Sequence, residues 1–459
     1  MTDKKIKLPA RASVFYLMGI IGSRAVGILT TPIFTRAMTE AEYGSYSYYI
    51  SILSIASMVS GVFLLPTVFY SGLGKFSDNK RGFSDTGIIL SSGINLCICI
   101  VLFAFNGFFG INKVIAPIIL LQILFDSVVT AELQRYKFSY GYKRVVAINL
   151  SSAILGAILS LALVFGGEMR AMGRILGLLI SGGIISGIIF YTRKEGGIIG
   201  GEAGKFLIKN ALPLIPAVIA RASVGWADKL IIKRDLGDAA LAKYSVAHTV
   251  GTAALALIGA LSSALNPWMI RKLKTGEEET VSLVTMELSA IISWGSVTLL
   301  ALAPEIFAFL APKSYNDALY VIAPLAISSL PFFLFSIASV LAGFYERTRF
   351  ISIATALGAA VSIILNIFLV PRIGFIAGGI AYLAAEVVMY LFVRRLLSGV
   401  GHNTAEALKP KGEIYLALVV GGAFLLLYGN LPLRILLLTV PLCEMVRHGF
   451  FCLDMVKEG

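Results

Sequence analysis

Long apolar runs alternate with short polar intervals along the whole chain of 459 residues. A helix that crosses a membrane needs about 20 mostly apolar residues, and this length applied along the chain predicts about 14 transmembrane helices. The predicted spans lie near residues 13–36, 46–70, 86–109, 114–133, 145–166, 172–191, 210–232, 245–269, 284–310, 318–343, 350–370, 374–396, 414–429 and 432–451. The pattern therefore predicts an all-α, polytopic membrane protein.

Composition supports this class. Hydrophobic residues make up 57% of the chain and charged residues 14%, and the mean hydropathy is +0.86. The apolar share exceeds that of soluble globular domains by about ten percentage points. The longest hydrophilic intervals, near 192–209 and 398–413, are too short for a catalytic or nucleotide-binding domain, so we do not predict an enzyme.

The net charge of +13 does not indicate a nucleic-acid partner, because the basic residues are scattered between apolar runs instead of gathered on one solvated face. The four cysteines, all in or beside apolar segments, are expected to be buried thiols and form neither a disulfide scaffold nor a metal cage. The three histidines are isolated from one another in the sequence, which predicts neither a metal site nor a catalytic base. No cofactor is expected.

Basic residues also predict the orientation of the chain in the membrane. Lys and Arg are retained in short cytoplasmic loops. If the N-terminus is cytoplasmic, the inside segments hold most of the 39 Lys and Arg residues. An even number of spans then places the C-terminus in the cytoplasm as well.

An internal repeat predicts the domain organisation. Residues 34–47 align with residues 232–245 with four identities, and each copy follows one predicted helix and enters the next. Helix seven therefore repeats helix one. We predict a six-helix lobe at 1–191, a cytoplasmic interlobe loop at 192–209, a second six-helix lobe at 210–397, and a cytoplasmic loop with two additional helices at 398–459.

Several motifs resemble a known family. The stretch Thr31–Gly44 (TPIFTRAMTEAEYG) is similar to the first-helix signature of polysaccharide biosynthesis proteins, the Wzx-type O-antigen flippases of the multidrug/oligosaccharidyl-lipid/polysaccharide (MOP) exporter superfamily. Leu212–Pro216 (LPLIP), Asp228–Ile232 (DKLII) and Ala242–Ala247 (AKYSVA) resemble its second-lobe pattern, although Lys243 stands where the family often has an apolar residue. Later landmarks also fit: Pro304–Ile306, Tyr315, Asn366, Pro371–Gly374 and Ala377–Ala381.

The resemblance, which covers residues 10 to 400, implies a transporter of the cell inner membrane. It would flip a polyprenyl-diphosphate-linked oligosaccharide, such as an O-antigen repeat unit of lipopolysaccharide, from the cytoplasmic to the periplasmic leaflet by alternating access. Implied partners are the undecaprenyl-diphosphate lipid, the membrane, a polysaccharide polymerase and a chain-length regulator. The alternatives are a cation-coupled multidrug exporter of the same superfamily and a flippase for the peptidoglycan precursor.

Two arginines at membrane depth are the candidate substrate-binding residues. An ionised side chain at the bilayer centre costs roughly 2.5–3.5 kcal/mol, so it must face protein or water. Arg24 lies deep in the first predicted helix and Arg221 at the matching depth of the seventh. We expect both to face one cavity and hold a diphosphate through paired hydrogen bonds. A structural ion pair with Asp126 or Asp228 is the alternative.

Three carboxylates are candidates for gating or ion coupling. Asp228, which the resemblance includes, is expected to gate or close the lobes, with simple snorkelling at a helix end as the alternative. Asp126 and Glu386 are expected to take a proton in a coupled cycle, or else to hydrogen-bond within a helix interface.

Overall fold

The computed structural model describes residues 3–109, 113–139, 141–192, 201–398, 408 and 413–458. Within these ranges the protein is almost entirely helical and contains no strand. It divides into two compact units, Met1–Ala222 and Ser223–Gly459.

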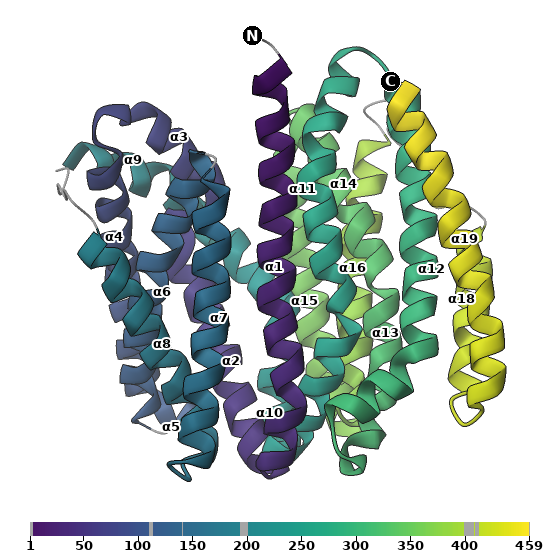
Figure 1. Ribbon diagram of the computed structural model, residues 1–459, viewed down its shortest axis with the longest axis horizontal. Helices are drawn as coiled ribbons and strands as arrows, with labels where there is room; N and C mark the ends of the chain where they lie inside the picture. The colour runs from purple at the N-terminus through teal and green to yellow at the C-terminus, as the bar shows by residue number, and fades with distance from the viewer. Residues whose placement is uncertain are drawn as a thin grey trace. The chain divides into compact units, whose positions relative to one another are not determined.

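The first unit is a bundle of long helices with short helical connections (Figure 1). Its elements are α1 (Asp3–Ala37), α2 (Glu40–Ser60), η1 (Gly61–Leu64), α3 (Pro66–Lys75), η2 (Ser77–Asn79), α4 (Lys80–Ala104), α5 (Asn106–Phe109), α6 (Ile115–Phe138), α7 (Tyr142–Phe165), α8 (Arg170–Thr192), α9 (Gly201–Ala211), η3 (Leu212–Leu214) and the start of α10 (Ile215–Gly251). The most extensive packing joins α7 to α8, α1 to α7 and α4 to α6.

The second unit contains the rest of α10 and a second set of long helices. They are α11 (Ala253–Lys274), α12 (Glu278–Leu310), η4 (Lys313–Val321), α13 (Ile322–Ile327), α14 (Ser329–Phe344), α15 (Thr348–Ile373), α16 (Ile376–Leu397), α18 (Glu413–Leu426) and α19 (Leu431–Glu458). Here α15 packs along α16, and α12 packs against both α18 and α19. The two C-terminal helices, yellow in Figure 1, are therefore attached to this unit through α12.

The predicted fold class, an all-α polytopic membrane protein, is confirmed. Ten helical segments of the described chain are long and apolar enough to cross a membrane, and each overlaps at least one predicted span. The other four predicted spans fall on α1, α11, α18 and α19. Of these, α18 is 14 residues long, shorter than the roughly 20 residues that a perpendicular crossing needs.

The segment predicted as an interlobe loop, 192–209, is helical over its described second half. Helix α9 buries Ala203, Leu207 and Ala211 in an apolar cluster of the first unit with Phe69 and Phe83. These three positions are four residues apart and so share one helix face. The loop prediction was wrong here because the surrounding Gly, Glu and Lys residues hid that spacing.

Glycine breaks α10 at the position where a loop was predicted between the seventh and eighth spans. Gly237 has φ +85° and ψ −179° and interrupts an otherwise continuous helix. Other L-residues rarely adopt a positive φ, whereas glycine does so readily. The backbone on both sides is helical, so the interval between these two predicted spans contains only a turn at this glycine.

Many serine and threonine hydroxyls donate hydrogen bonds to carbonyls of their own helices. In α2 and α6, Ser51 donates to the carbonyl of Ser47 at 2.7 Å and Ser127 to that of Ile123 at 2.8 Å. In α12, Ser289 and Ser293 donate in the same way at 2.7 and 2.8 Å. This local bonding removes the cost of placing unpaired hydroxyls in an apolar environment.

The prediction of buried cysteines was only partly right. Cys99 is buried, whereas Cys97 and Cys443 are exposed, and the side chain of Cys452 lies outside the described residues. Cys97 precedes Cys99 by two positions, or about 200° around a helix, and so faces away from the packed side of α4.

Candidate functional site

The first unit contains a cavity of about 500 Å³. Its walls come from the end of α2, η1, the start of α3, the middle of α6 and the start of α10. Leu64, Leu65, Leu214 and Val218 make most of it apolar. The elements that enclose it belong to candidate membrane spans, so the charged groups in its wall lie on helices of membrane-spanning length.

Two of the predicted site residues, Arg221 and Asp126, line this cavity. Arg221 is half-buried in the second turn of α10, on the same helix face as Val218, which precedes it by three residues. Asp126 lies halfway along α6, and its Oδ1 accepts a hydrogen bond from Nε2 of Gln122 at 3.1 Å. The cavity therefore combines a guanidinium and a carboxylate in a largely apolar enclosure.

Arg24 does not line this cavity in the described part of the chain. It is exposed on α1. An added Cβ at Gly22 would lie 2.7 Å from Leu150 of α7, and one at Gly19 would lie 3.4 Å from Val146 of the same helix. Glycines 19 and 22 thus face α7, while Arg24, about 200° around the helix from Gly22, faces away from it. Its predicted role in binding a diphosphate stays a prediction.

Asp228 lies in a buried polar cluster of the second unit. Its side chain is 1% exposed, accepts a hydrogen bond from the backbone N–H of Lys229 at 2.7 Å, and accepts another from the hydroxyl of Tyr244. Lys229, 6% exposed, holds its Nζ 4.0 Å from the ring centroid of Trp226. A group that snorkelled at a helix end would reach water, and Asp228 does not.

The space for this cluster depends on a glycine of α16. A Cβ at Gly378 would lie 2.8 to 2.9 Å from ring atoms of Tyr244, so a larger residue would displace the hydroxyl that binds Asp228. Further along the same helix, Glu386 is fully buried where α16 packs along α15 and α14. The gating and coupling roles of these carboxylates stay predictions.

Two buried contacts between α12 and α19 were not predicted from the sequence, an Arg–Glu ion pair and a His–Glu contact. Arg434, 4% exposed, binds both carboxylate oxygens of Glu305 at 2.8 and 2.6 Å. Near the other end of the contact, Nδ1 of His448 lies 2.5 Å from Oε2 of Glu287, with each side chain 4% exposed. The partners are more than a hundred residues apart, so no local spacing could have linked them.

Arg174 is a further buried cation, which the sequence analysis did not single out. Its side chain is 8% exposed in α8, and its guanidinium lies 4.0 Å from the ring centroid of Phe34 and 3.9 Å from that of Tyr46. These contacts are of the cation–π type. Tyr43 and Tyr49 are buried as well.

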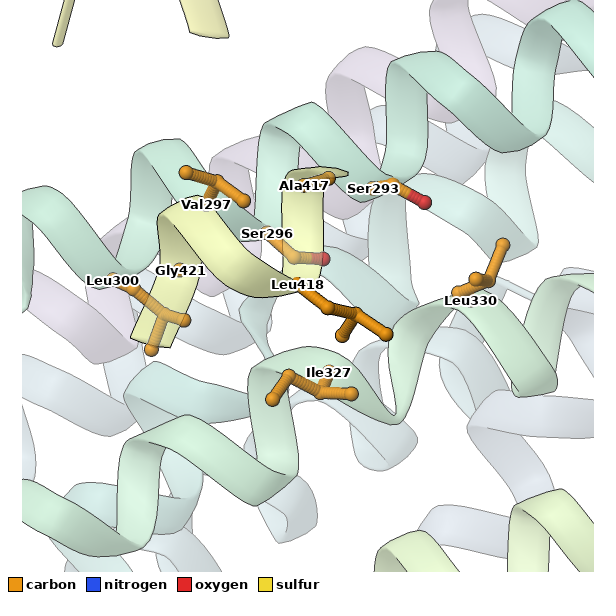
Figure 2. Close-up of a pocket in the computed structure, with 9 residues that line it drawn as sticks. All are labelled: Ser293, Ser296, Val297, Leu300, Ile327, Leu330, Ala417, Leu418 and Gly421. Atoms are coloured by element: carbon orange, nitrogen blue, oxygen red, sulfur yellow. The ribbon is translucent and has the colours of Figure 1, made fainter. Parts of the chain in front are cut away.

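A second, smaller cavity lies in the second unit. Figure 2 shows Ser296, Leu300, Ile327 and Leu418 around it, contributed by α12, α13 and α18. Its volume of about 30 Å³ is enough for only about two water molecules. The first cavity is therefore the better candidate for binding a substrate.

In the described part of the chain, no group of three or more His, Cys, Asp or Glu residues has the arrangement needed to hold a metal ion. The polar groups of the first cavity are an arginine, a carboxylate, hydroxyls and an amide. Such a set can bind phosphate and hydroxyl groups.

Comparisons with known proteins agree with this architecture. The lipid II flippase MurJ in an inward closed conformation superimposes with a TM-score of 0.67 at 15% identity, over 92% of this chain and 99% of that one. An inward-facing multidrug resistance MATE family transporter gives 0.56 at 14% identity, over 81% and 98% of the two chains. A MOP superfamily transporter from Pyrococcus furiosus, described as having a binding pocket of reverse polarity, gives 0.62 at 14% identity, over 87% and 99%.

These likenesses establish the fold of the MOP superfamily transporters. No curated protein sequence matches the chain significantly. The family model of polysaccharide biosynthesis proteins, however, matches residues 10–273, which is more than half of the chain. The protein therefore belongs to the polysaccharide biosynthesis protein family.

Proposed function

We propose that this membrane transporter flips a polyprenyl-diphosphate-linked oligosaccharide, such as an O-antigen repeat unit, from the cytoplasmic to the outer leaflet of the inner membrane. The observation that carries the proposal is the cavity of about 500 Å³ with Arg221 in its wall, in a chain of the polysaccharide biosynthesis family. A diphosphate joined to sugars needs a cation and hydrogen-bonding groups at membrane depth.

Arg221 supplies the cation in this proposal. A guanidinium remains charged at any physiological pH and can hold phosphate oxygens through two parallel N–H bonds. The largely apolar wall around it lowers the local dielectric constant, which strengthens the interaction. Arg24 is the second proposed phosphate ligand, and it would meet the diphosphate on its way into or out of the protein.

The buried carboxylates serve the transport cycle in this proposal. Asp228 gates the second unit through its hydrogen bond with Tyr244, and Asp126 and Glu386 are the proposed proton carriers. A polymerase and a chain-length regulator would act on the flipped repeat unit, and both termini would lie in the cytoplasm.

One observation favours a second candidate. Asp126 places a carboxylate in the same cavity, and such a group would suit an organic cation expelled by a multidrug exporter like the structurally similar MATE proteins. The similarity to the lipid II flippase likewise keeps the peptidoglycan precursor as an alternative lipid-linked substrate. Arg221 favours an anionic diphosphate over a cation.

Translocation in proteoliposomes tests the proposal. A fluorescent polyprenyl-diphosphate oligosaccharide is placed in one leaflet, and its arrival in the other is followed with an external quencher. We expect translocation by the wild type, a loss of at least tenfold in Arg221→Ala, as expected for about 1.4 kcal/mol or more of lost binding, and little change in Arg372→Ala, an exposed arginine of α15.

Two negative outcomes would contradict different parts of the proposal. If both the wild type and Arg221→Ala translocate the lipid equally, the arginine site is wrong and the flippase remains. If the wild type moves no lipid but expels ethidium under an imposed ion gradient, the exporter replaces the flippase.

A further inference from the structure

Four polar side chains of α6 line the cavity of the first unit: Asp126, Ser127, Thr130 and Gln134. At about 100° per residue they fall within an arc of about 100° on one helix face, and they extend over about 12 Å along the axis. We call these four residues the polar stripe. Because it is longer than one pyranose ring, the polar stripe can pass along more than one sugar.

Contacts with neighbouring groups orient the polar stripe and leave it able to bind more. The hydroxyl of Tyr70 donates to Oε1 of Gln134 at 2.7 Å. This hydrogen bond orients the amide and leaves its N–H donors able to bind another group. The hydroxyl of Ser127 donates to its own helix and keeps its acceptor lone pairs. Thr130, which is half-buried, forms no side-chain hydrogen bond with any residue that the structure describes.

The wall of the cavity outside the polar stripe is mainly aliphatic and includes Leu64, Leu65, Leu214 and Val218, with Arg221 one turn beyond Val218. A pyranose ring is amphiphilic in the same way, since its edge carries hydroxyl groups and its faces carry C–H groups. Ligand pockets commonly combine an apolar lining with a few placed polar groups that fix orientation. The polar stripe therefore matches a saccharide better than it matches a lipid chain.

We propose that the polar stripe of α6 is a saccharide subsite, in which Thr130, Gln134 and Asp126 bind the hydroxyls of a neutral sugar while Arg221 holds the diphosphate of the same molecule. The inference rests on the proposed function. The sugar is neutral because Asp126 would repel a carboxylated sugar at short range in an apolar enclosure. Specificity for the saccharide then resides in α6, and recognition of the diphosphate in α10.

Binding to the purified protein in nanodiscs separates the two roles. The probes are undecaprenyl diphosphate without sugar and a panel of undecaprenyl-diphosphate saccharides of one to five neutral sugars. We expect Thr130→Val and Gln134→Leu each to weaken binding of the best saccharide probe by about three- to tenfold, the effect of one lost hydrogen bond, and to leave binding of the sugar-free lipid unchanged. Arg221→Ala weakens both.

Thr355→Val is the matched control, because the Thr355 hydroxyl of α15 donates to its own helix at 2.8 Å and lies outside this cavity. Unchanged binding of the sugar-free lipid also shows that each variant is folded. The subsite is overturned if Thr130→Val and Gln134→Leu bind saccharide probes as the wild type does, if they lose both kinds of lipid equally, or if sugars add nothing to wild-type binding. A wild type that binds neither lipid overturns the proposed function itself.

Discussion

Arg434 binds Glu305 through two parallel hydrogen bonds, from Nη1 to Oε2 at 2.8 Å and from Nη2 to Oε1 at 2.6 Å. Nη1 also donates to the carbonyl of Ala301 at 2.7 Å. The guanidinium is almost fully buried, and Glu305 is 44% exposed. The Arg434 side chain of α19 thus binds two residues of α12, Ala301 and Glu305, which lie one helical turn apart.

Replacing this arginine should loosen the C-terminal helix. We expect Arg434→Met to lower the free energy of unfolding by about 1–3 kcal/mol, because both acceptors lose a charged donor. Glu305→Gln should cost less, since water reaches the exposed carboxylate. Unfolding in detergent titrations measures both. Arg372→Met is the control, and an equal loss in that variant would contradict a specific tie between α12 and α19.

The His448 and Glu287 pair should show coupling. His448→Leu removes the imidazole that contacts the buried Glu287 carboxylate, and losing a hydrogen bond to a charged group costs about 1.5–3 kcal/mol. The double variant Glu287→Met/His448→Leu should recover part of this loss, because it also replaces the buried carboxylate by an apolar side chain. A double-mutant cycle on thermal unfolding checks the coupling, and strictly additive losses would refute it.

Two glycines of α8 should respond oppositely to the same substitution. A Cβ at Gly177 would lie 2.4 Å from the backbone nitrogen of Ser160 in α7, whereas nothing lies within 4 Å of a Cβ at Gly187. Gly177→Ala should therefore destabilise the protein by about 1–3 kcal/mol through overpacking. Gly187→Ala should be neutral or slightly stabilising. Thermal unfolding of both variants provides the test, and equal midpoints would show that α7 and α8 are less closely packed.

Removing the hydroxyl of Tyr244 should lower the stability of the protein, whereas removing that of Tyr49 should not. Tyr244→Phe removes a donor from the buried carboxylate of Asp228, with an expected cost of about 1.5–3 kcal/mol. The hydroxyl of Tyr49 is buried and has no hydrogen-bond partner among the described residues, so Tyr49→Phe should change stability little. Comparing the free energies of unfolding of the two variants decides the point, and a large loss in Tyr49→Phe would reveal a bound water or ligand at that hydroxyl.

The turn after α11 should contribute a small pH-dependent stabilisation. Hydrogen bonds from Lys272, at 2.6 Å, and Thr275 lower the pKa of the Glu277 carboxyl. Its folded-state pKa lies below the ordinary value of about 4.3. The contribution is therefore present above that value and is lost as the pH falls through the folded-state pKa.

The thermal midpoint measured against pH tests this. The difference between the wild type and Glu277→Gln should be present at pH 6 and should disappear in acid. A difference that is the same at both pH values would show that the carboxylate charge plays no part.

The helices could be predicted well from the sequence, because a membrane span is visible as a local run of apolar residues. Prediction failed where the signal was short or masked by polar neighbours. Helix α9 is an example, since its three buried positions lie between Glu202, Lys205 and Lys209. Gly237 is another, because a helix–glycine–helix turn and a polar loop have similar local composition.

The candidate site was predictable only as a set of residue types. Hydropathy singles out Arg221 and Asp126 as charges at membrane depth, but their meeting in one cavity depends on how α6 packs near α10. Arg24 has the same signal in the sequence and yet lies elsewhere, because Gly19 and Gly22 turn the opposite face of α1 toward α7. Whether each charged side chain reaches the cavity depends on the direction in which it leaves its helix. A single sequence does not specify that direction.

The hydroxyls of Ser289 and Ser293 are satisfied as soon as α12 forms, but the α19 partners of its glutamates are synthesised much later. They follow Glu305 by 129 residues and Glu287 by 161. At about 5–20 residues per second, the ribosome needs roughly 6 to 30 s to reach them. During that interval Glu287 and Glu305 lack these contacts, so α12 can reach its final packing only after α19 has been made. The arrival of α19 then completes the integration of a helix made long before it.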